Sequence, residues 1–306
     1  MEIDKKIIKF EEVSRSNDVK KFFSNSLVMQ LFKIIKQLIF SSIKYILEIF
    51  FCFQDFIYLI KQKNNFSEQD CIILGNGPSL NLIDENELIK FQNNNNKIFA
   101  INYWNENIKY KKIVPDYLII TDEKVFFEKE KIFSEILYKK NKNLLDYLYR
   151  NKNIILIITP KILIKFKNKI KNRYLIFSDS EFDLIYNCVI PIFPRGYASV
   201  SAVKVLALAK WLNFKNIFLL GMDNSYFKYL FSDKDNKILY DDVHSYNDKI
   251  IIDYTKTYKY MSNYIKDHLK VFQAFELFAN ENNIFNLDLK SLTNCFKKKE
   301  VDKLNK

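Results

Sequence analysis

The chain has 306 residues, carries a formal net charge of +12 and is 48% hydrophobic. This length suits one large α/β domain with an appendage, and this hydrophobic share excludes a wholly disordered chain. The charge favours anionic partners such as nucleotides, acidic sugars or an anionic membrane surface. No recognised nucleic-acid-binding motif is present, so we expect no nucleic acid among the partners.

The first 66 residues contain neither Gly nor Pro and are predicted to form a helical N-terminal region. The opening MEIDKKIIKFEE is too charged for a signal peptide. The cysteines have neither CxxC nor metal-ligand spacing, so we expect a cytoplasmic chain with reduced thiols and no metal site. The four are Cys52, Cys71, Cys188 and Cys295.

The longest apolar stretch runs from Leu27 to Ile60 and is interrupted by charged residues. We therefore predict an amphipathic helix rather than a membrane-spanning one, with the lysines and Glu48 near one face. Two interpretations stay open. The helix packs on the catalytic domain, or residues 20–62 make peripheral contact with the inner face of the cytoplasmic membrane.

After a polar stretch at 61–70, interpreted as a linker, short apolar runs alternate with helical patterns. This alternation predicts a Rossmann-like α/β domain over residues 67–300, with a mostly parallel sheet and helices on both faces. The expected strands are Cys71–Gly75, Lys97–Ile101, Tyr117–Thr121, Ile154–Ile158, Tyr174–Phe177, Ile217–Gly221 and Ile284–Leu287. The expected helices are Glu85–Phe91, Val125–Arg150, Pro160–Lys169, Val200–Leu212 and Ile250–Asn282, followed by a frayed basic tail at 297–306.

Glycine is informative because the chain has only four. Two of them fall in the turn that follows the first expected strand, which reads Gly75-Asn76-Gly77-Pro78-Ser79. Glycine permits close backbone approach to a ligand or a positive φ, and open α/β sheets bind ligands where strands end in this way. We expect a nucleotide-binding turn here. The alternative is a tight turn without a ligand.

Other strand ends carry polar side chains that are expected at the same edge of the sheet. Asn102 suits a base or ribose contact, Asp122 a hydroxyl or phosphate contact, and Gly221 and Asp223 end a later strand. Asn and Asp also favour turns for purely local reasons, so the set is more informative than its members.

Two further features suggest chemistry. Arg195 and Ser199 precede a helix and predict an anion site, unless they are a surface arginine and an N-cap. His244 is one of two histidines and lies beside Asp241 and Asp242, which would raise its pKa. A general base is expected there, the alternative being a surface-loop histidine. The other, His268, is predicted to be a surface residue.

These motifs resemble a known group. The Gly75–Ser79 turn, the Asn102 strand end, and the segments 121–128, 199–223, 244–246 and 283–296 resemble bacterial single-domain Rossmann-like α-2,3-sialyltransferases. They also resemble the MptE-like and motility-associated flagellin glycosyltransferase group, which shares that fold. The resemblance covers about residues 70–296. It departs from the pattern at Asp122, where the sialyltransferases generally have Asn, and at Asn213, which replaces a usual Gly.

The resemblance implies a glycosyltransferase that needs no cofactor and moves an acidic sugar from a CMP donor to a cell-surface glycan such as lipopolysaccharide or capsule. His244 would be the base, and Tyr226 and Tyr246 would assist phosphate departure. The alternative is an MptE-like pyrophosphokinase using ATP and Mg²⁺, with Asp223, Asp241 and Asp242 as ligands. A non-catalytic protein that binds a partner through residues 20–62 is a third interpretation.

Overall fold

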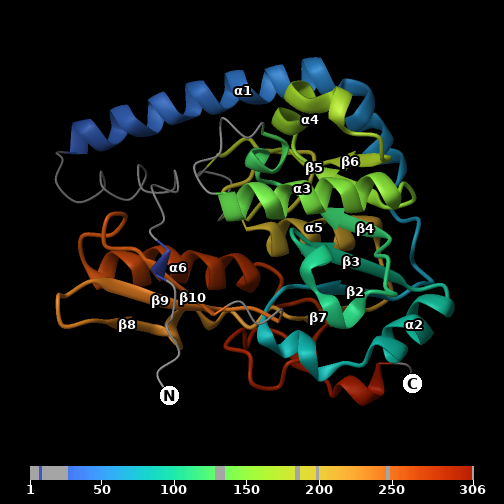
Figure 1. Cartoon of the computed structure of the whole chain (residues 1–306). Coiled ribbons are helices and arrows are strands. Elements are labelled where there is room, and N and C mark those ends of the chain that lie inside the picture. The colour runs from blue at the N-terminus through green and yellow to red at the C-terminus, as the bar shows by residue number, and fades with distance from the viewer. Residues whose placement is uncertain are drawn as a thin grey trace.

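The centre of the molecule is an eight-stranded sheet in which every pairing is parallel (Figure 1). The computed structural model describes residues 7–8, 27–127, 135–182, 187–197, 200–245 and 249–304. The strand order is β12-β11-β7-β2-β3-β4-β5-β6. In chain order these strands are β2 (Cys71–Leu74), β3 (Lys97–Ile101), β4 (Tyr117–Ile119), β5 (Ile155–Ile158), β6 (Tyr174–Ile176), β7 (Ile217–Leu220), β11 (Ile284–Asn286) and β12 (Lys297–Lys298). The predicted Rossmann-like class and all seven predicted strands are confirmed.

Apart from the edge strand β12, which consists of two exposed lysines, the strands are mostly apolar because both faces of the sheet are covered. Ile72 and Leu74 face one hydrophobic core and Cys71 and Ile73 face the other, and all four side chains are fully buried. The first core is closed by α2, α3, α4 and the end of α1, and the second by α5 and α6. The helices are α1 (Leu27–Lys61), α2 (Glu85–Asn93), α3 (Glu135–Arg150), α4 (Pro160–Phe166), α5 (Ser201–Leu212) and α6 (Met261–Glu276).

A second, four-stranded sheet lies beside α6 and was not predicted (Figure 1). Its order is β1-β10-β9-β8, and the pairings of β9 with its two neighbours are antiparallel. Its strands are β1 (Ile7–Ile8), β8 (Leu230–Ser232), β9 (Ile238–Val243) and β10 (Lys249–Asp253). The predicted helix over 250–282 is therefore wrong in its first part. The β-branched run Ile250–Ile252 pairs with β9, and the helix begins only at Met261.

Three other predictions need correction. The stretch 61–70 is no free linker, because Phe66 stacks on Phe214 with ring centroids 4.8 Å apart and its N–H bonds the carbonyl of Leu212. The C-terminal segment is not frayed where it is described, since Lys297 and Lys298 pair with β11. The helix expected at 125–150 begins at Glu135 within the described chain, and residues 128–134 lie outside it.

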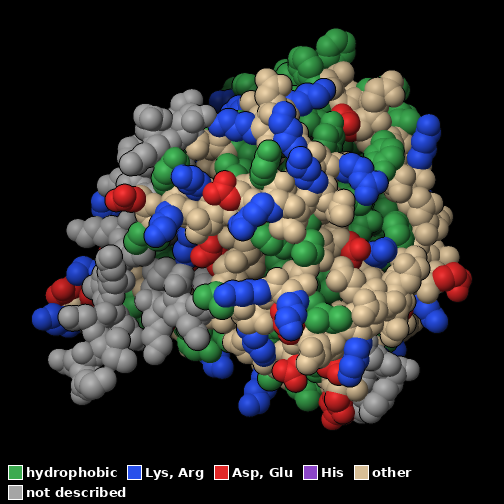
Figure 2. Space-filling view, turned by 45° about the vertical axis from the view of Figure 1, so that its right-hand side comes forward, with side chains coloured by type: hydrophobic (Ala, Val, Ile, Leu, Met, Phe, Trp, Pro, Cys, Tyr) green, Lys and Arg blue, Asp and Glu red, His purple; other side chains and the backbone are tan. Residues whose placement is uncertain are grey.

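Helix α1 crosses the top of the molecule and bends at Cys52, whose φ of −122° and ψ of 22° are not helical (Figure 1). The arm after the bend packs into the domain through Cys52, Phe56 and Leu59. The arm before the bend exposes many apolar side chains, and Figure 2 shows hydrophobic side chains at the top of the molecule with Lys and Arg close by. No helix within the described residues combines the length and hydropathy of a membrane span.

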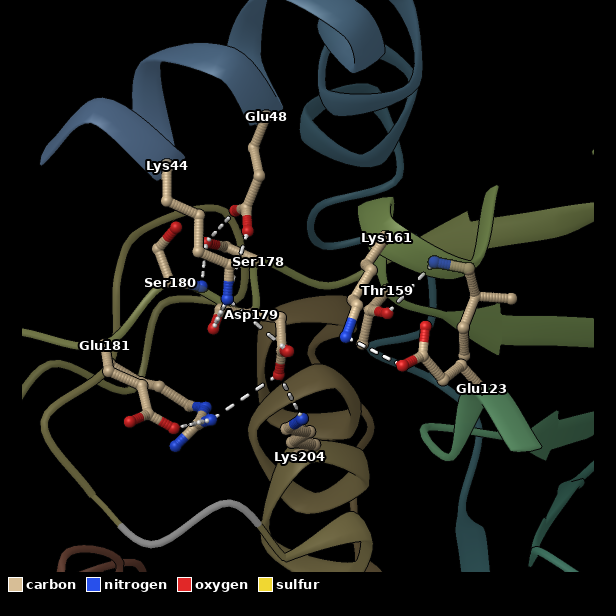
Figure 3. Close-up of polar contacts among 12 residues, drawn as sticks. Lys44, Glu48, Glu123, Thr159, Lys161, Ser178, Asp179, Ser180, Glu181 and Lys204 are labelled. Atoms are coloured by element: carbon tan, nitrogen blue, oxygen red, sulfur yellow. Dashed lines mark hydrogen bonds and ion pairs between the residues drawn. The ribbon is translucent and has the colours of Figure 1, made fainter. Parts of the chain in front are cut away.

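An ion network fastens the first arm of α1 to the segment after β6 (Figure 3). Lys44 Nζ donates to the carbonyl of Asp179 at 2.7 Å, and Ser178 Oγ donates to Glu48 Oε2 at 2.7 Å. Glu48 is only 4% exposed, and burial raises the pKa of its carboxyl. Burying such groups is costly unless they are paired, so these contacts fix which face of α1 turns toward the domain.

The same network continues into α5. Lys204 is 1% exposed and its Nζ lies 2.8 Å from Asp179 Oδ1. Burial alone would raise the pKa of Asp179, but Lys204 and Arg195 overcome it and hold that pKa below its usual range. Burial lowers the pKa of the Lys204 ammonium. Each buried charge therefore has a counter-charge, which links α1, the β6 exit and α5 into one unit.

Gly75 and Gly221 lie where the segments that leave β2 and β7 make backbone contact. A Cβ on Gly75 would lie 2.2 Å from the carbonyl oxygen of Gly221, and a Cβ on Gly221 would lie 2.4 Å from that of Gly75. By contrast, left-handed turns in the described chain are mostly made by asparagine, at positions 64, 95, 102, 213, 224 and 236. Glycine is thus retained at Gly75 because no side chain fits, which confirms the argument from its scarcity.

We predict that Gly75→Ala lowers the free energy of unfolding by about 3 kcal/mol, because its Cβ meets backbone that cannot rotate away. The matched control is Asn213→Gly at the end of α5, where φ is 63°, a conformation that glycine adopts without strain. It should change stability by less than about 0.5 kcal/mol. Urea unfolding measures both, and a Gly75→Ala protein as stable as the wild type would contradict the close contact.

Candidate functional site

The strand order brings the predicted strand ends together. Strands β7, β2, β3 and β4 are neighbours in that order, so Asp223, the Gly75–Ser79 turn, Asn102 and Asp122 all follow the same edge of the sheet. The carboxyl edge of an open parallel sheet is where ligands bind in this class of fold. The candidate site is the junction between the exits of β2 and β7.

The Gly75–Ser79 turn is bonded to the β7 exit along its length. Gly75 N donates to the carbonyl of Leu220 and Gly77 N to that of Gly221, each at 2.8 Å. Ser79 N donates to Asp223 Oδ1 at 3.1 Å, while Gly221 N donates to Ser79 Oγ at 3.0 Å. A Cβ on Gly77 would lie 1.8 Å from Asp223 Oδ2. The contacts of Ser79 with Asp223 and Gly221 therefore hold the turn against the β7 exit.

Asp223 is paired with a second carboxyl group, Asp288, which follows β11. Burial, together with the side-chain hydrogen bond between the two, raises the pKa of Asp223 to about 6. Asp288 is 5% exposed. It was missed from the sequence, although β11 lies next to β7 and the strand-end rule that selected Asp223 also selects Asp288. The pair places a titratable carboxyl directly behind the turn.

The raised pKa of Asp223 predicts a pH-dependent stability. The folded state holds the proton more tightly than the unfolded state, so this contribution is complete below about pH 4 and is lost as the pH rises through about 6. We expect Asp223→Asn to remove a decline on the order of 2 kcal/mol between these pH values. Urea unfolding at a series of pH values measures it. The exposed Asp235→Asn is the control and should keep the decline.

The His244 segment is tied to the same turn. Ser245 N donates to the carbonyl of Asn76 at 2.8 Å, and Ser245 Oγ donates to Asn107 Oδ1 at 2.5 Å. Asn107 Nδ2 in turn donates to Asn76 Oδ1 at 3.1 Å. We call Asn76, Asn107 and Ser245 the amide latch. Asn107 was missed because nothing in an asparagine-rich sequence distinguishes it from its neighbours.

His244 follows β9 and is the residue before the latch. Its Nε2 lies 2.9 Å from Asp242 Oδ2, and its side chain is 29% exposed. A carboxylate can only accept, so this contact favours the tautomer with the proton on Nε2 and the lone pair on Nδ1. The arrangement has the form of a base and its orienting carboxylate. The sequence selected His244 and its neighbour Asp242, and the structure places Asp242 in β9, just before His244.

Other predicted site residues have local partners. Asn102 adopts φ 52° between β3 and the following turn. Asp122 is exposed and caps the short 3₁₀ helix Glu123–Phe126 by accepting from Lys124 N at 2.9 Å. Pro78 begins the 3₁₀ helix Pro78–Leu82. Their contacts with a ligand stay predictions.

Tyr226 belongs to an aromatic cluster around the other histidine. Its ring centroid lies 4.7 Å from that of His268, which stacks on Tyr264 at 3.9 Å and whose Nδ1 lies 2.9 Å from the carbonyl of Tyr264. His268 is 8% exposed, so its prediction as a surface residue is wrong. It lies on the inward face of α6. Tyr246 and Ser199 lie outside the described residues.

Arg195 is in a different cluster from the turn. It is 3% exposed, its Nη2 lies 2.6 Å from Glu181 Oε1, and its Nη1 donates to the carbonyl of Tyr197 at 2.7 Å. The scarcity of arginine suggested planar recognition of an anion, and that geometry is present. The carboxylate that it contacts in the structure is Glu181 of the same chain, and a role of Arg195 in binding an anionic ligand stays a prediction.

The fold and this junction define a Rossmann-like α/β protein with polar strand ends gathered at one carboxyl edge. The model of the family described as 6-hydroxymethylpterin diphosphokinase MptE-like matches residues 41–228. Because that is more than half of the 306 residues, the chain belongs to the MptE-like family. This confirms the MptE-like part of the resemblance.

One solved structure is described as a MAf glycosyltransferase from Magnetospirillum magneticum AMB-1. It aligns with a TM-score of 0.44 and 9% identity over 80% of this chain and 37% of that chain. This chain thus spans little more than a third of that protein. No curated protein matches.

Proposed function

We propose that the chain is a glycosyltransferase that binds a nucleotide-activated sugar at the Gly75–Ser79 turn and uses His244 as general base. One observation carries the proposal. The amide latch holds the residue after His244 against the carbonyl of Asn76, so a base-and-carboxylate pair and the expected nucleotide turn belong to one structural unit. A donor at the turn and an acceptor near His244 would then be neighbours.

In the proposed reaction the acceptor hydroxyl attacks the anomeric carbon of the donor. A new carbon–oxygen bond forms there, the bond from that carbon to the phosphate oxygen breaks, and the hydroxyl proton passes to His244 Nδ1. The interaction of Asp242 with Nε2 would stabilise the resulting imidazolium. Charge then grows on the departing phosphate, where we assign hydroxyl donation to Tyr226 and Tyr246.

The donor and acceptor are proposed by chemistry and by resemblance. A CMP-linked acidic sugar suits the basic chain and the sialyltransferase-like motifs, and a cell-surface glycan such as lipopolysaccharide or capsule suits as acceptor. Asn102 and Asp122 are proposed to contact the base and ribose. Assembly of such a glycan would place the protein in the cytoplasm.

We predict that His244→Ala lowers the rate of sugar transfer by about 10²- to 10⁴-fold while donor affinity changes little. The base faces the acceptor, whereas the nucleotide rests on the turn. Transfer from a panel of CMP- and UMP-linked sugars measures the rate, and calorimetry measures donor affinity. Asp242→Asn should lose less rate than His244→Ala, because it disturbs only the orientation of the imidazole. A fully active His244→Ala protein would exclude His244 as the base.

A pyrophosphokinase is the second candidate, because the family takes its description from one. The sequence nominated Asp223, Asp241 and Asp242 as Mg²⁺ ligands, but no group of three metal-binding side chains forms among the described residues. The pair that does form is Asp223 with Asp288, and two adjacent carboxyl groups fit a divalent cation that would relieve their repulsion. Bound there, Mg²⁺ would neutralise the phosphates of ATP.

The two candidates differ in their response to chelation. We predict that transfer continues in EDTA, and that CMP binds more tightly than ATP in a calorimetric screen. Pyrophosphoryl transfer from ATP, abolished by EDTA or by Asp288→Asn, would instead establish the second candidate. Asp288→Asn is informative because it removes a carboxyl while leaving the bonds between Ser79 and Asp223 in place.

A further inference from the structure

The outer face of α1 is a continuous apolar stripe. It runs through Phe32, Ile35, Ile39, Ile43, Ile46 and Phe50, each more than half exposed. The steps of three, four, four, three and four residues follow the 3.6-residue turn of a straight helix. Phe40, Leu47, Phe51 and Phe53 widen the stripe as far as the bend. Exposed apolar patches of this kind on soluble proteins mark interaction sites.

The opposite face of α1 is fixed to the domain and cannot be exchanged with the stripe. Lys44, Glu48 and Tyr45 all point inward, and Tyr45 donates from its hydroxyl to the carbonyl of Ile192 at 3.0 Å. Rolling the helix to bury the stripe would break the ion network and leave buried charges unpaired. The stripe is therefore held outward as a rigid feature of the fold.

Charge along α1 is asymmetric. Its two acidic residues turn away from solvent, with Glu48 buried and Asp55 partly buried. Lys36 and Lys61 are exposed, and Lys36 Nζ lies 5.8 Å from the ring centroid of Phe40. Among the described side chains of α1, every fully exposed ionisable group that is charged at neutral pH is thus cationic. An apolar stripe flanked by lysine is the pattern of a helix that lies in an anionic membrane surface.

A shallow hollow of about 350 Å³ opens on one flank of the helix. It is lined by Ser42, Tyr45, Ile46, Phe182 and Pro194. Its lining is mostly apolar and it adjoins the stripe through Ile46, so a chain-like apolar group could continue from the stripe into it. A stripe with 3.6-residue periodicity runs straight along the helix, so it can lie on a flat surface along its whole length.

We propose that α1 is an interfacial helix that rests on an anionic phospholipid surface, with the Phe32–Phe50 stripe among the acyl chains and the lysines at the headgroups. Because the ion network fixes α1 to the rest of the chain, the orientation of α1 on the membrane also sets the orientation of the catalytic domain. The proposal is independent of the reaction assigned above, because it rests on α1 alone.

The test is vesicle sedimentation of the full-length protein. Vesicles of phosphatidylcholine with about 30% phosphatidylglycerol, in about 0.1 M salt, should bind the wild type more tightly than pure phosphatidylcholine does. Ile39→Glu with Ile43→Glu should weaken binding by at least about tenfold. The matched control is Ile265→Glu with Leu269→Glu, an exposed pair of the same spacing on α6. It should bind as the wild type does.

Three results would overturn the proposal. The wild type fails to sediment with anionic vesicles, or both double variants bind equally well. Alternatively, ultracentrifugation without lipid shows a wild-type dimer that the α1 pair dissociates, which would assign the stripe to a second copy of the chain. Circular dichroism and urea unfolding confirm that each variant is folded, and since both α1 positions are exposed the substitutions leave the core intact.

Discussion

The backbone contact between Gly75 and Gly221 is the constraint on which the candidate site depends. It allows the exits of β2 and β7 to approach so closely that the turn bonds the neighbouring strand with its own amides. Ser79 and Asp223 can then reach one another, and the outward side of the turn is left with the carbonyl of Asn76 to receive Ser245. A side chain at either glycine would separate the strands and move the Gly75–Ser79 turn, the carboxyl pair and the His244 segment together.

Seven strands of the main sheet could be predicted because they are largely buried and form apolar runs in the sequence. The eighth, β12, was missed because it consists of two exposed lysines. The small sheet could not be predicted, because β8 has only three residues and β9 and β10 mix apolar residues with Asp or Lys. In addition β1, the partner of β10, lies more than 200 residues earlier. The same limit hid the amide latch. Asn107 matters through Ser245, which is 138 residues away, and no local pattern reports such a contact. Asp288 is different, since the strand-end rule was sufficient to find it.

The ion network explains why the periodicity of the α1 sequence alone could not predict which face of the helix packs on the domain. Leu, Ile and Phe occupy most of the helix, so an apolar face could be drawn on several sides of it. The deciding contacts join Lys44 and Glu48 to Ser178 and Asp179, more than 100 residues later. The result reverses the usual arrangement, in which charged residues face water and apolar ones face the domain. The carboxylate partner of Arg195, Glu181, was likewise not predicted from the sequence.

The structure of the turn also controls how readily Asn76 deamidates. Asn76 and Gly77 form an Asn-Gly dipeptide, the sequence in which deamidation is easiest. The backbone nitrogen of the glycine attacks the side-chain amide carbon of the asparagine and closes a succinimide ring, which opens to aspartate or isoaspartate. Here the nitrogen of Gly77 is occupied by its bond to Gly221, and the Asn76 amide is held at both ends, by the carbonyl of Ile101 and by Asn107. The attack requires both groups to rotate. Deamidation at this position therefore needs the strand exits to separate first, so its rate reports how often the folded protein opens at the carboxyl edge of its main sheet.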